Sequence, residues 1–180
     1  MKILIVGGSK SGKSMAAQRI ARMLAARGSC PAYYWATMEP SDSEDEKRIA
    51  RHLEARAGWG FETIECGRHI LDALEGADAR GSFLLDSVTA LLANEMFAPE
   101  DFDAHAAERV ADELEEFVRR TGSAVLVSDY LYGDAALFDE WTENYRRGLA
   151  LIDRRLAACC ENVLEVSSGQ VICHKGVRPL

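Results

Sequence analysis

The chain has 180 residues, of which 48% are hydrophobic, and this length predicts one folded domain over residues 1–180. Its formal net charge of −8 argues against a general nucleic-acid surface, because phosphate backbones are bound mainly by accumulated Lys and Arg. The apolar run before Gly7 is too short for a signal peptide, and no run approaches the ~20 residues of a membrane span, so we expect a cytoplasmic protein without a membrane span.

Alternating apolar runs and helical patterns predict an α/β fold with a mostly parallel sheet flanked by helices. The run 2–6 is expected to form the first strand, and the helix after it, over 13–27, is expected to bury Met15 and Ile20. Further strands are expected over 32–37, 61–64, 82–86 and 124–128, helices over 45–57, 104–120 and 141–160, and a C-terminal hairpin from 162–166 and 170–173.

A phosphate-binding loop follows the first strand. Its residues are Gly7, Gly8, Ser9, Lys10, Ser11, Gly12, Lys13 and Ser14, which fit the pattern GxxxxGK(S/T). The pattern stands between an apolar strand and a helix N-terminus, where backbone N–H groups and the helix dipole favour phosphate. Lys13 is expected to reach the β- and γ-phosphates, and Ser14 to bind Mg²⁺. We therefore predict a P-loop NTPase-like (RecA-like) fold.

Two further residues are chemical candidates on their own patterns. Asp86 ends the strand 82–86, where it can hold Mg²⁺ in the manner of a Walker B acid, although a strand-end or helix-capping role fits equally well. His52 lies among arginines, whose charge favours the neutral imidazole and leaves a ring nitrogen free to attack phosphorus. A solvated surface histidine is the alternative.

The cysteines argue against a disulfide framework and against a zinc site. They are odd in number, include an adjacent doublet and form no CxxC pair, so we expect buried free thiols. They are Cys30, Cys66, Cys159, Cys160 and Cys173.

With these residues assembled, the chain resembles the bifunctional adenosylcobinamide kinase / adenosylcobinamide-phosphate guanylyltransferase family of cobalamin biosynthesis. The loop Gly7 to Ser14 is similar to the family's GG-A/S-R/K-SGKS, and Trp35-Ala36-Thr37 to its Y-I/V-AT. The segment Arg48 to Arg56 resembles RIxxH(R/K)xxR, Thr63-Ile64-Glu65 resembles T-x-E, and Leu84 to Thr89 resembles LL-E/D-x-I/V/L-T.

The resemblance implies an enzyme that uses ATP or GTP with Mg²⁺ to phosphorylate a corrinoid, adenosylcobinamide. It also implies that His52 takes GMP from GTP and passes it to adenosylcobinamide phosphate, and that the chain forms a homo-oligomer, with a trimer favoured. For that attack the helix carrying His52 has to swing or sit over the P-loop, so we expect a mobile element between Glu39 and Gly58. Lys13 and His52 are the implied catalytic residues, and Ser14 and Asp86 the implied metal ligands. Beyond the P-loop, the implied nucleotide contacts are Ala36, Thr37, Met38, Leu53, Glu54, Ala55, Arg56, Glu65 and Asp86.

The C-terminal half departs from the pattern of the family. After the strand 124–128 the family continues N-E-x-G-x-G-x-x-P, whereas this chain has Asp129 to Asp134 with one glycine and no proline. The family's Asn-Gln falls near Asp153-Arg154. These departures motivate an alternative hypothesis, which is a regulatory nucleotide-binding P-loop protein or a small-molecule kinase that lacks guanylyl transfer.

Overall fold

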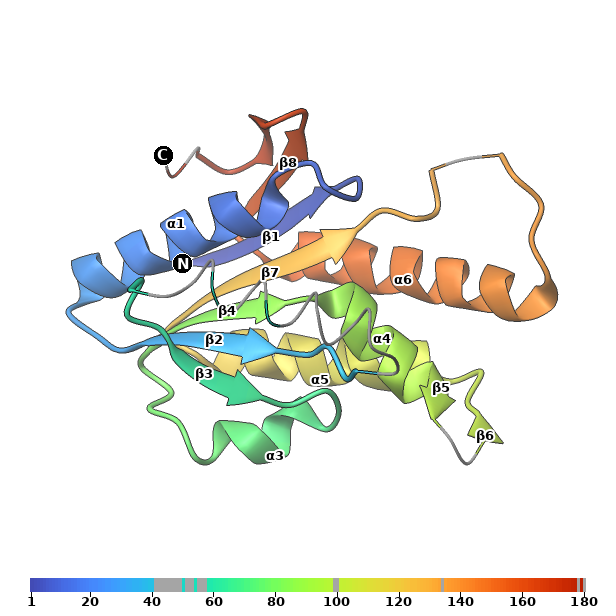
Figure 1. Ribbon diagram of the computed structural model, residues 1–180, viewed down its shortest axis with the longest axis horizontal. Helices are drawn as coiled ribbons and strands as arrows, with labels where there is room; N and C mark the ends of the chain where they lie inside the picture. The colour runs from blue at the N-terminus through green and yellow to red at the C-terminus, as the bar shows by residue number, and fades with distance from the viewer. Residues whose placement is uncertain are drawn as a thin grey trace.

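A seven-stranded sheet forms the centre of the computed structural model, which describes residues 1–40, 50, 54, 58–98, 101–133, 135–177 and 179. The strands of this sheet are β1 (Lys2–Gly7), β2 (Ala32–Ala36), β3 (Glu62–Glu65), β4 (Ser82–Asp86), β7 (Ser123–Asp129), β8 (Asn162–Ser167) and β9 (Gln170–Lys175). Their order across the sheet is β3-β2-β4-β7-β1-β8-β9 (Figure 1). All neighbouring strands pair in parallel except β9, which is antiparallel to β8. The predicted mostly parallel sheet and C-terminal hairpin are therefore confirmed.

Helices cover both faces of the sheet. The helices are α1 (Lys13–Gly28), α3 (Ile70–Leu74), α4 (Val88–Met96), α5 (Ala106–Arg120) and α6 (Glu140–Cys159). Helix α1 lies on one face, and the others lie on the opposite face (Figure 1). A separate two-stranded hairpin is formed by β5 (Phe97–Ala98) and β6 (Asp101–Phe102). None of the helices in the described ranges is both long and apolar enough to span a membrane.

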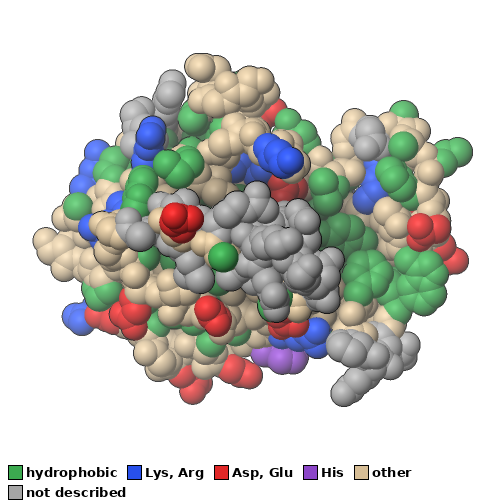
Figure 2. All heavy atoms as spheres, viewed as in Figure 1, with side chains coloured by type: hydrophobic (Ala, Val, Ile, Leu, Met, Phe, Trp, Pro, Cys, Tyr) green, Lys and Arg blue, Asp and Glu red, His purple; other side chains and the backbone are tan. Residues whose placement is uncertain are grey.

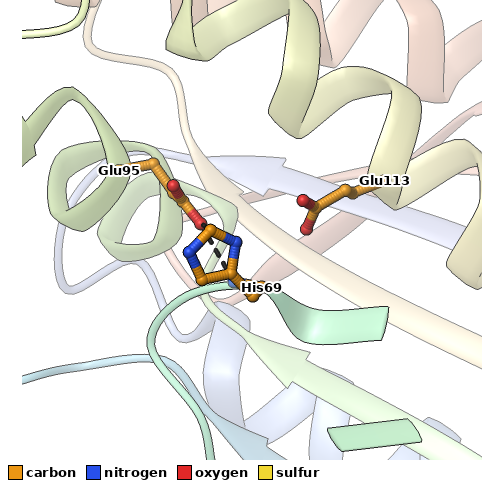
Figure 3. Close-up of side chains that lie close together, drawn as sticks. All are labelled: His69, Glu95 and Glu113. Carbon is orange, nitrogen blue, oxygen red and sulfur yellow. Dashed lines mark hydrogen bonds and ion pairs between the residues drawn. The ribbon is translucent and has the colours of Figure 1, made fainter. Parts of the chain in front are cut away.

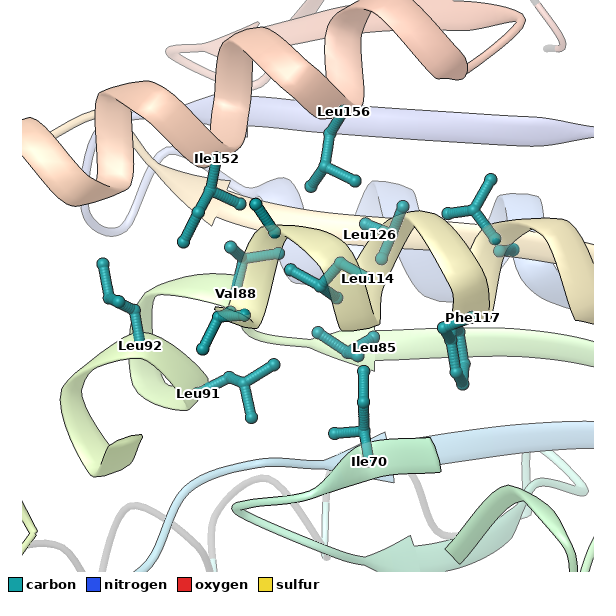
Figure 4. Close-up of a cluster of buried hydrophobic side chains, with 14 of the residues drawn as sticks. Ile70, Leu85, Val88, Leu91, Leu92, Leu114, Phe117, Leu126, Ile152 and Leu156 are labelled. Carbon is teal, nitrogen blue, oxygen red and sulfur yellow. The ribbon is translucent and has the colours of Figure 1, made fainter. Parts of the chain in front are cut away.

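The larger core lies between the sheet and α3 to α6. Leu85 of β4, Leu126 of β7, Leu114 of α5 and Ile152 of α6 are all fully buried and meet there (Figure 4). Strands covered on both faces bury consecutive apolar residues rather than alternate ones, which explains the uninterrupted apolar runs of β4 and β7. This packing fixes the carboxyl ends of the central strands, where the P-loop lies.

The face of α1 that packs on the sheet excludes Met15, which corrects one sequence expectation. Ala17, Ile20, Ala21 and Leu24 are buried against the sheet, whereas Met15 is 43% exposed. At 3.6 residues per turn, position 15 lies away from the face shared by positions 17, 20, 21 and 24, so the Met15 side chain points away from the sheet. The expected burial of Met15 is therefore wrong.

The expected burial of the cysteines is also largely wrong. All five are free, as expected, but only Cys160 is buried. Cys159 is exposed at the last turn of α6, and Cys173 is half-buried on the edge strand β9. Cys30 and Cys66 are half-buried in connections between elements. Thiols at helix ends, edges and connections remain in contact with solvent.

We predict that Leu114→Ala lowers the free energy of unfolding by about 2–5 kcal/mol, because Leu114 is fully buried and its truncation leaves a cavity. Urea unfolding monitored by circular dichroism measures the change. The control is Val177→Ala, since Val177 is 80% exposed and its truncation should leave stability nearly unchanged. Equal effects of the two substitutions would contradict the assigned core.

Candidate active site

The P-loop connects β1 to α1 at the carboxyl edge of the sheet. Gly12 adopts φ +99°, in the left-handed region that favours glycine, and a Cβ on Gly7 would lie 2.4 Å from the Val166 carbonyl oxygen of β8. The turn therefore needs glycine at both positions. Helix α1 begins at Lys13 without a side-chain cap. Its first N–H groups are therefore available to an anion, because a helix leaves these donors without internal partners.

Lys13 is held inside the loop by an ion pair. Its side chain is 7% exposed, and its Nζ donates to the Gly8 carbonyl oxygen at 2.7 Å and to Asp129 Oδ1 at 2.5 Å. Asp129 is the last residue of β7 and lies opposite Gly7 in the register of β1 with β7. A buried ammonium requires such partners, because burial of an unpaired charge is costly. The pair holds Lys13 back along the loop toward Gly8.

Asp129 is a residue that the sequence analysis did not select as a site residue. The departure from the family pattern begins there, and the same segment was used only to motivate the regulatory alternative. Its position could have been found by the argument applied to Asp86, since both carboxylates end buried parallel strands at one edge. The contact with Lys13, however, requires β7 to neighbour β1, which sequence order alone does not reveal.

Three of the predicted nucleotide contacts lie in one row at this edge. Ala36 of β2 pairs in register with Glu65 of β3 on one side and with Asp86 of β4 on the other. Glu65 is exposed, and Ala36 and Asp86 are half-buried. The Tyr34 hydroxyl donates to Asp86 Oδ2 at 2.7 Å. The cap of α4 is Ser87, whose Oγ accepts from the Ala90 N–H, so Asp86 is a strand-end carboxylate and not the helix cap.

Thr37 and Asn94 join the ends of β2, β3 and β4. The buried Thr37 hydroxyl accepts from the Ser87 N–H at 2.7 Å and donates to the Ser87 carbonyl oxygen at 2.8 Å. The Asn94 amide donates to the carbonyl oxygens of Thr37 and Gly67. The Thr37 side chain is therefore occupied by the fold, and Met38, the next predicted contact, is half-buried beside it.

The central segment of the predicted site lies mostly outside the described residues. His52, Leu53, Ala55 and Arg56 belong to this undescribed part, as does most of the helix expected over 45–57. Glu54 is described and is helical and exposed. The role predicted for His52 and the movement predicted for its helix thus stay predictions.

The P-loop fits a nucleotide phosphate and a hard cation. It lines a cavity of about 230 Å³ whose walls include Lys10, Ser11 and Met15. The Ser11 Oγ is buried and has no hydrogen-bond partner among the described residues, so it has a donor to offer a ligand. The half-buried Ser14 hydroxyl and the Asp86 carboxylate are oxygen ligands of the kind that Mg²⁺ prefers.

A second polar cluster lies behind Asp129. Asp153 of α6 is 5% exposed, and its Oδ2 accepts from the Tyr132 hydroxyl at 2.7 Å. Burial, with a smaller contribution from the charge of Asp129, raises the pKa of Asp153 to about 6 against the opposing effect of hydrogen bonds from Tyr132 and Ser128. Within the described part of the chain, neither Asp153 Oδ1 nor Ser128 Oγ completes a hydrogen bond of normal geometry. A buried carboxyl group with a perturbed pKa is characteristic of functional sites.

His69, Glu95 and Glu113 form another cluster, at the start of α3 (Figure 3). One ligand atom of each lies within 4.8 Å of the others. Glu95 accepts from the His69 N–H at 2.9 Å and from Arg109 at 3.1 Å. Burial and the charge of Glu95 raise the pKa of Glu113. Arg109 and backbone N–H groups already balance these carboxylates. Holding α3 against α4 and α5 is therefore enough to explain the cluster.

We predict that Asp153→Asn stabilises the fold near neutral pH. The folded state raises the pKa of Asp153 from 3.8 to about 6, so the cost of ionising Asp153 in the fold grows between about pH 4 and pH 6 and is complete above about pH 6. Removal of that charge should increase the free energy of unfolding by about 2–3 kcal/mol at about pH 7.5, and the gain should vanish below about pH 4. Urea unfolding at several pH values measures it.

The matched control is Asp112→Asn, because the Asp112 side chain is 71% exposed in a surface ion pair with Arg155. That substitution should have a small effect. If Asp153→Asn destabilises the protein at neutral pH, or gives a gain that does not change with pH, the inferred cost of burying the Asp153 charge is wrong.

Comparisons with known proteins agree with this geometry. A family model described as cobinamide kinase / cobinamide phosphate guanyltransferase matches residues 3–173. The bifunctional adenosylcobalamin biosynthesis protein CobU of Salmonella typhimurium is 33% identical over 184 residues, covering 94% of this chain and 97% of that protein. The bifunctional adenosylcobalamin biosynthesis protein CobP of Pseudomonas aeruginosa is 31% identical over 179 residues, covering 98% of both chains.

Solved structures support the fold independently. A KaiC-like protein of Pyrococcus horikoshii superimposes with a TM-score of 0.55 at 13% identity, over 97% of this chain and 78% of that one. At such low identity the likeness shows the fold alone, and it agrees with the predicted P-loop NTPase-like (RecA-like) fold. Together with the match over nearly the whole chain, these findings show that the protein belongs to the cobinamide kinase / cobinamide phosphate guanyltransferase family.

Proposed function

We propose that this chain, acting as a single P-loop domain over residues 1–180, carries out both reactions of its family. It phosphorylates adenosylcobinamide with ATP or GTP, and it transfers GMP from GTP to adenosylcobinamide phosphate, giving adenosylcobinamide-GDP. The observation that carries the proposal is the P-loop with its buried, paired Lys13, in a chain that matches the family model over residues 3–173. The regulatory alternative has no better support among the relatives.

For the kinase step, the P-loop binds the triphosphate and positions its terminal phosphoryl group. Lys13 neutralises charge on the β- and γ-phosphates, and the amides at the start of α1 add donors. The loop residues from Gly7 to Ser14 form the phosphate cradle. Ser14 and Asp86 would hold Mg²⁺, which supplies further charge neutralisation when bound. Catalysis of this kind depends mainly on positioning, which a rigid sheet edge provides.

For guanylyl transfer, His52 is the proposed nucleophile. Its ring nitrogen forms a bond to the α-phosphorus of GTP, and pyrophosphate leaves with the electron pair of the broken P–O bond. A phosphate oxygen of adenosylcobinamide phosphate then attacks the same phosphorus and releases the imidazole. The nucleotide contacts proposed for this step are Ala36, Thr37, Met38, Leu53, Glu54, Ala55, Arg56, Glu65 and Asp86.

The proposed setting is the cytoplasm, where nucleoside triphosphates are available, and the proposed partner is the small corrinoid and not a nucleic acid. The net charge of −8 supports the second point, since nucleic-acid binding relies on accumulated cations.

A homo-oligomer, with a trimer favoured, is part of the same proposal. Hydrophobic side chains gather on the right-hand side of the molecule in Figure 2, over the region where Figure 1 draws β5, β6 and the start of α6. There Phe97 is 45% and Trp141 54% exposed, and Phe102 contacts both rings. We call Phe97, Phe102 and Trp141 the aromatic patch. Exposed apolar patches of this kind mark interaction surfaces.

Labelling of the protein by GTP tests guanylyl transfer. With GTP radiolabelled at the α-phosphate and Mg²⁺, the wild-type chain should acquire an acid-labile, base-stable label, and His52→Ala should acquire none, because the phosphoramidate bond needs the imidazole. Denaturing electrophoresis measures the label. His105→Ala, which removes an exposed histidine elsewhere, is the control and should label normally. Absence of a wild-type label while GTP binds would contradict guanylyl transfer.

Light scattering tests the oligomer. Trp141→Glu should shift the wild-type oligomer to monomer, because a charge in an apolar contact is not compensated. Val177→Glu, a charge placed at a residue that is 80% exposed outside the aromatic patch, should leave the oligomer intact. A wild-type monomer would refute the oligomer itself, and an oligomer that persists in Trp141→Glu would exclude the aromatic patch as its interface.

A further inference from the structure

We propose that Asp129 is the proton acceptor of the kinase step, taking the proton from the corrinoid hydroxyl as that oxygen attacks the γ-phosphorus. This inference rests on the proposed kinase function and goes beyond it, because it assigns a catalytic role to a residue in the segment where the chain departs from the family pattern.

The first support is the distance from Asp129 to the phosphate-binding lysine. Asp129 Oδ1 lies 2.5 Å from Lys13 Nζ, and a P-loop lysine contacts the β- and γ-phosphates of the bound nucleotide. The carboxylate is therefore one contact away from the phosphoryl group that is transferred. The Asp129 side chain is 26% exposed, so an incoming hydroxyl can reach it, whereas Lys13 is buried.

The second support is that the backbone of Asp129 is held in place. Its N–H donates to Thr89 Oγ1 at 2.8 Å, and the Tyr145 hydroxyl donates to the Thr89 carbonyl oxygen at 2.8 Å. Thr89 lies on α4 and Tyr145 on α6, so two helices fix the end of β7. The pairing of Asp129 with Gly7 fixes it relative to the P-loop as well. A catalytic carboxylate has to be preorganised in this way.

The charges that face Asp129 come from both sides. Lys13 of α1 presents the cation, and from α6 the carboxylate of Asp153 and the phenol of Tyr145 interact with Asp129 electrostatically. Burial raises the pKa of Tyr145, and the charges of Asp129 and Asp153 raise it further, so this phenol stays neutral.

The other acid at this edge is less suited to the same task. Asp86 accepts a hydrogen bond from the Tyr34 hydroxyl and pairs in register with Ala36 of β2, on the side of β4 away from β1. Strand β7 separates β4 from β1, so Asp86 is one strand further from the P-loop than Asp129. Of these two strand-end carboxylates, Asp129 is the one bonded to Lys13.

The chemistry balances without a further reactant. The hydroxyl oxygen forms a bond to the γ-phosphorus, and the bond from that phosphorus to the β,γ-bridging oxygen breaks. The nucleoside diphosphate leaves with that electron pair. The hydroxyl proton passes to the Asp129 carboxylate and then to solvent, as a carboxylate accepts the substrate hydroxyl proton in protein kinases.

The test uses the full-length protein and measures the two reactions separately. The kinase reaction is phosphate transfer from ATP to adenosylcobinamide, and the guanylyl transfer is followed from GTP and adenosylcobinamide phosphate. Asp129→Asn keeps the size and the hydrogen-bond acceptor offered to Lys13 but cannot take a proton. We expect its kinase kcat to fall by about 10²–10⁴-fold, with the KM for ATP little changed and guanylyl transfer retained.

A further readout separates proton transfer from support of the fold. Asp129→Ala should regain kinase rate when formate is added, because a small carboxylate can occupy the vacated space. Asp112→Asn, an exposed carboxylate-to-amide change on α5, is the matched control and should behave as wild type.

The outcomes are distinguishable. If Asp129→Asn keeps the wild-type kcat, or if it loses guanylyl transfer together with the kinase reaction, Asp129 is not the proton acceptor. If the wild-type protein itself phosphorylates no adenosylcobinamide, the proposed kinase function fails, whatever the variants do.

Discussion

The candidate site depends on one buried charge. Lys13 is 7% exposed at the first position of α1, and the fold supplies it with a carbonyl oxygen from Gly8 and a carboxylate from Asp129. An ammonium group in this position destabilises the fold unless it is paired. The pairing partner comes from β7, so the P-loop is complete only when β7 lies beside β1. The parallel sheet and the phosphate site are in this sense one structure.

The environment of Asp129 has a cost in stability. Burial raises the pKa of Asp153 to about 6, so its ionisation near neutral pH opposes folding. The phenols of Tyr132 and Tyr145 also lie in this region, one bonded to Asp153 and the other to the backbone of Thr89. A protein that needed only stability would fill this space with apolar groups, since buried charge rarely stabilises. The presence of these carboxylates is therefore better explained by the chemistry proposed at the P-loop.

The sequence predicted the fold class and the P-loop because both have local signals. Periodicity predicts the strand 2–6 and the amphipathic helix 104–120, and turn chemistry predicts the glycine loop between strand and helix. The bounds of the strand and of the helix each lie within two residues of the observed β1 and α5. The ion pair of Lys13 with Asp129 joins residues 116 positions apart and follows from strand order, which no local pattern encodes. The predicted burial of Met15 was wrong for a related reason, since the packing against the sheet determines which face of α1 is buried.

The two proposed reactions draw mainly on different stretches of one sheet edge. Lys13 and Asp129, proposed for the kinase step, lie at the start of α1 and the end of β7, whereas the proposed nucleotide contacts Ala36 and Glu65 lie at the ends of β2 and β3. Asp86 of β4 lies between them and is proposed for both reactions. Neighbouring strands are about 4.8 Å apart, so the ends of β1 and β2 are separated by three spacings, about 14 Å. Such a separation lets terminal phosphoryl transfer and attack at the α-phosphorus depend on different residues of one domain. The departures from the family pattern at Asp129 and Asp153 fall near the P-loop, so they bear on the proposed kinase step more than on the proposed nucleotide contacts Ala36 and Glu65.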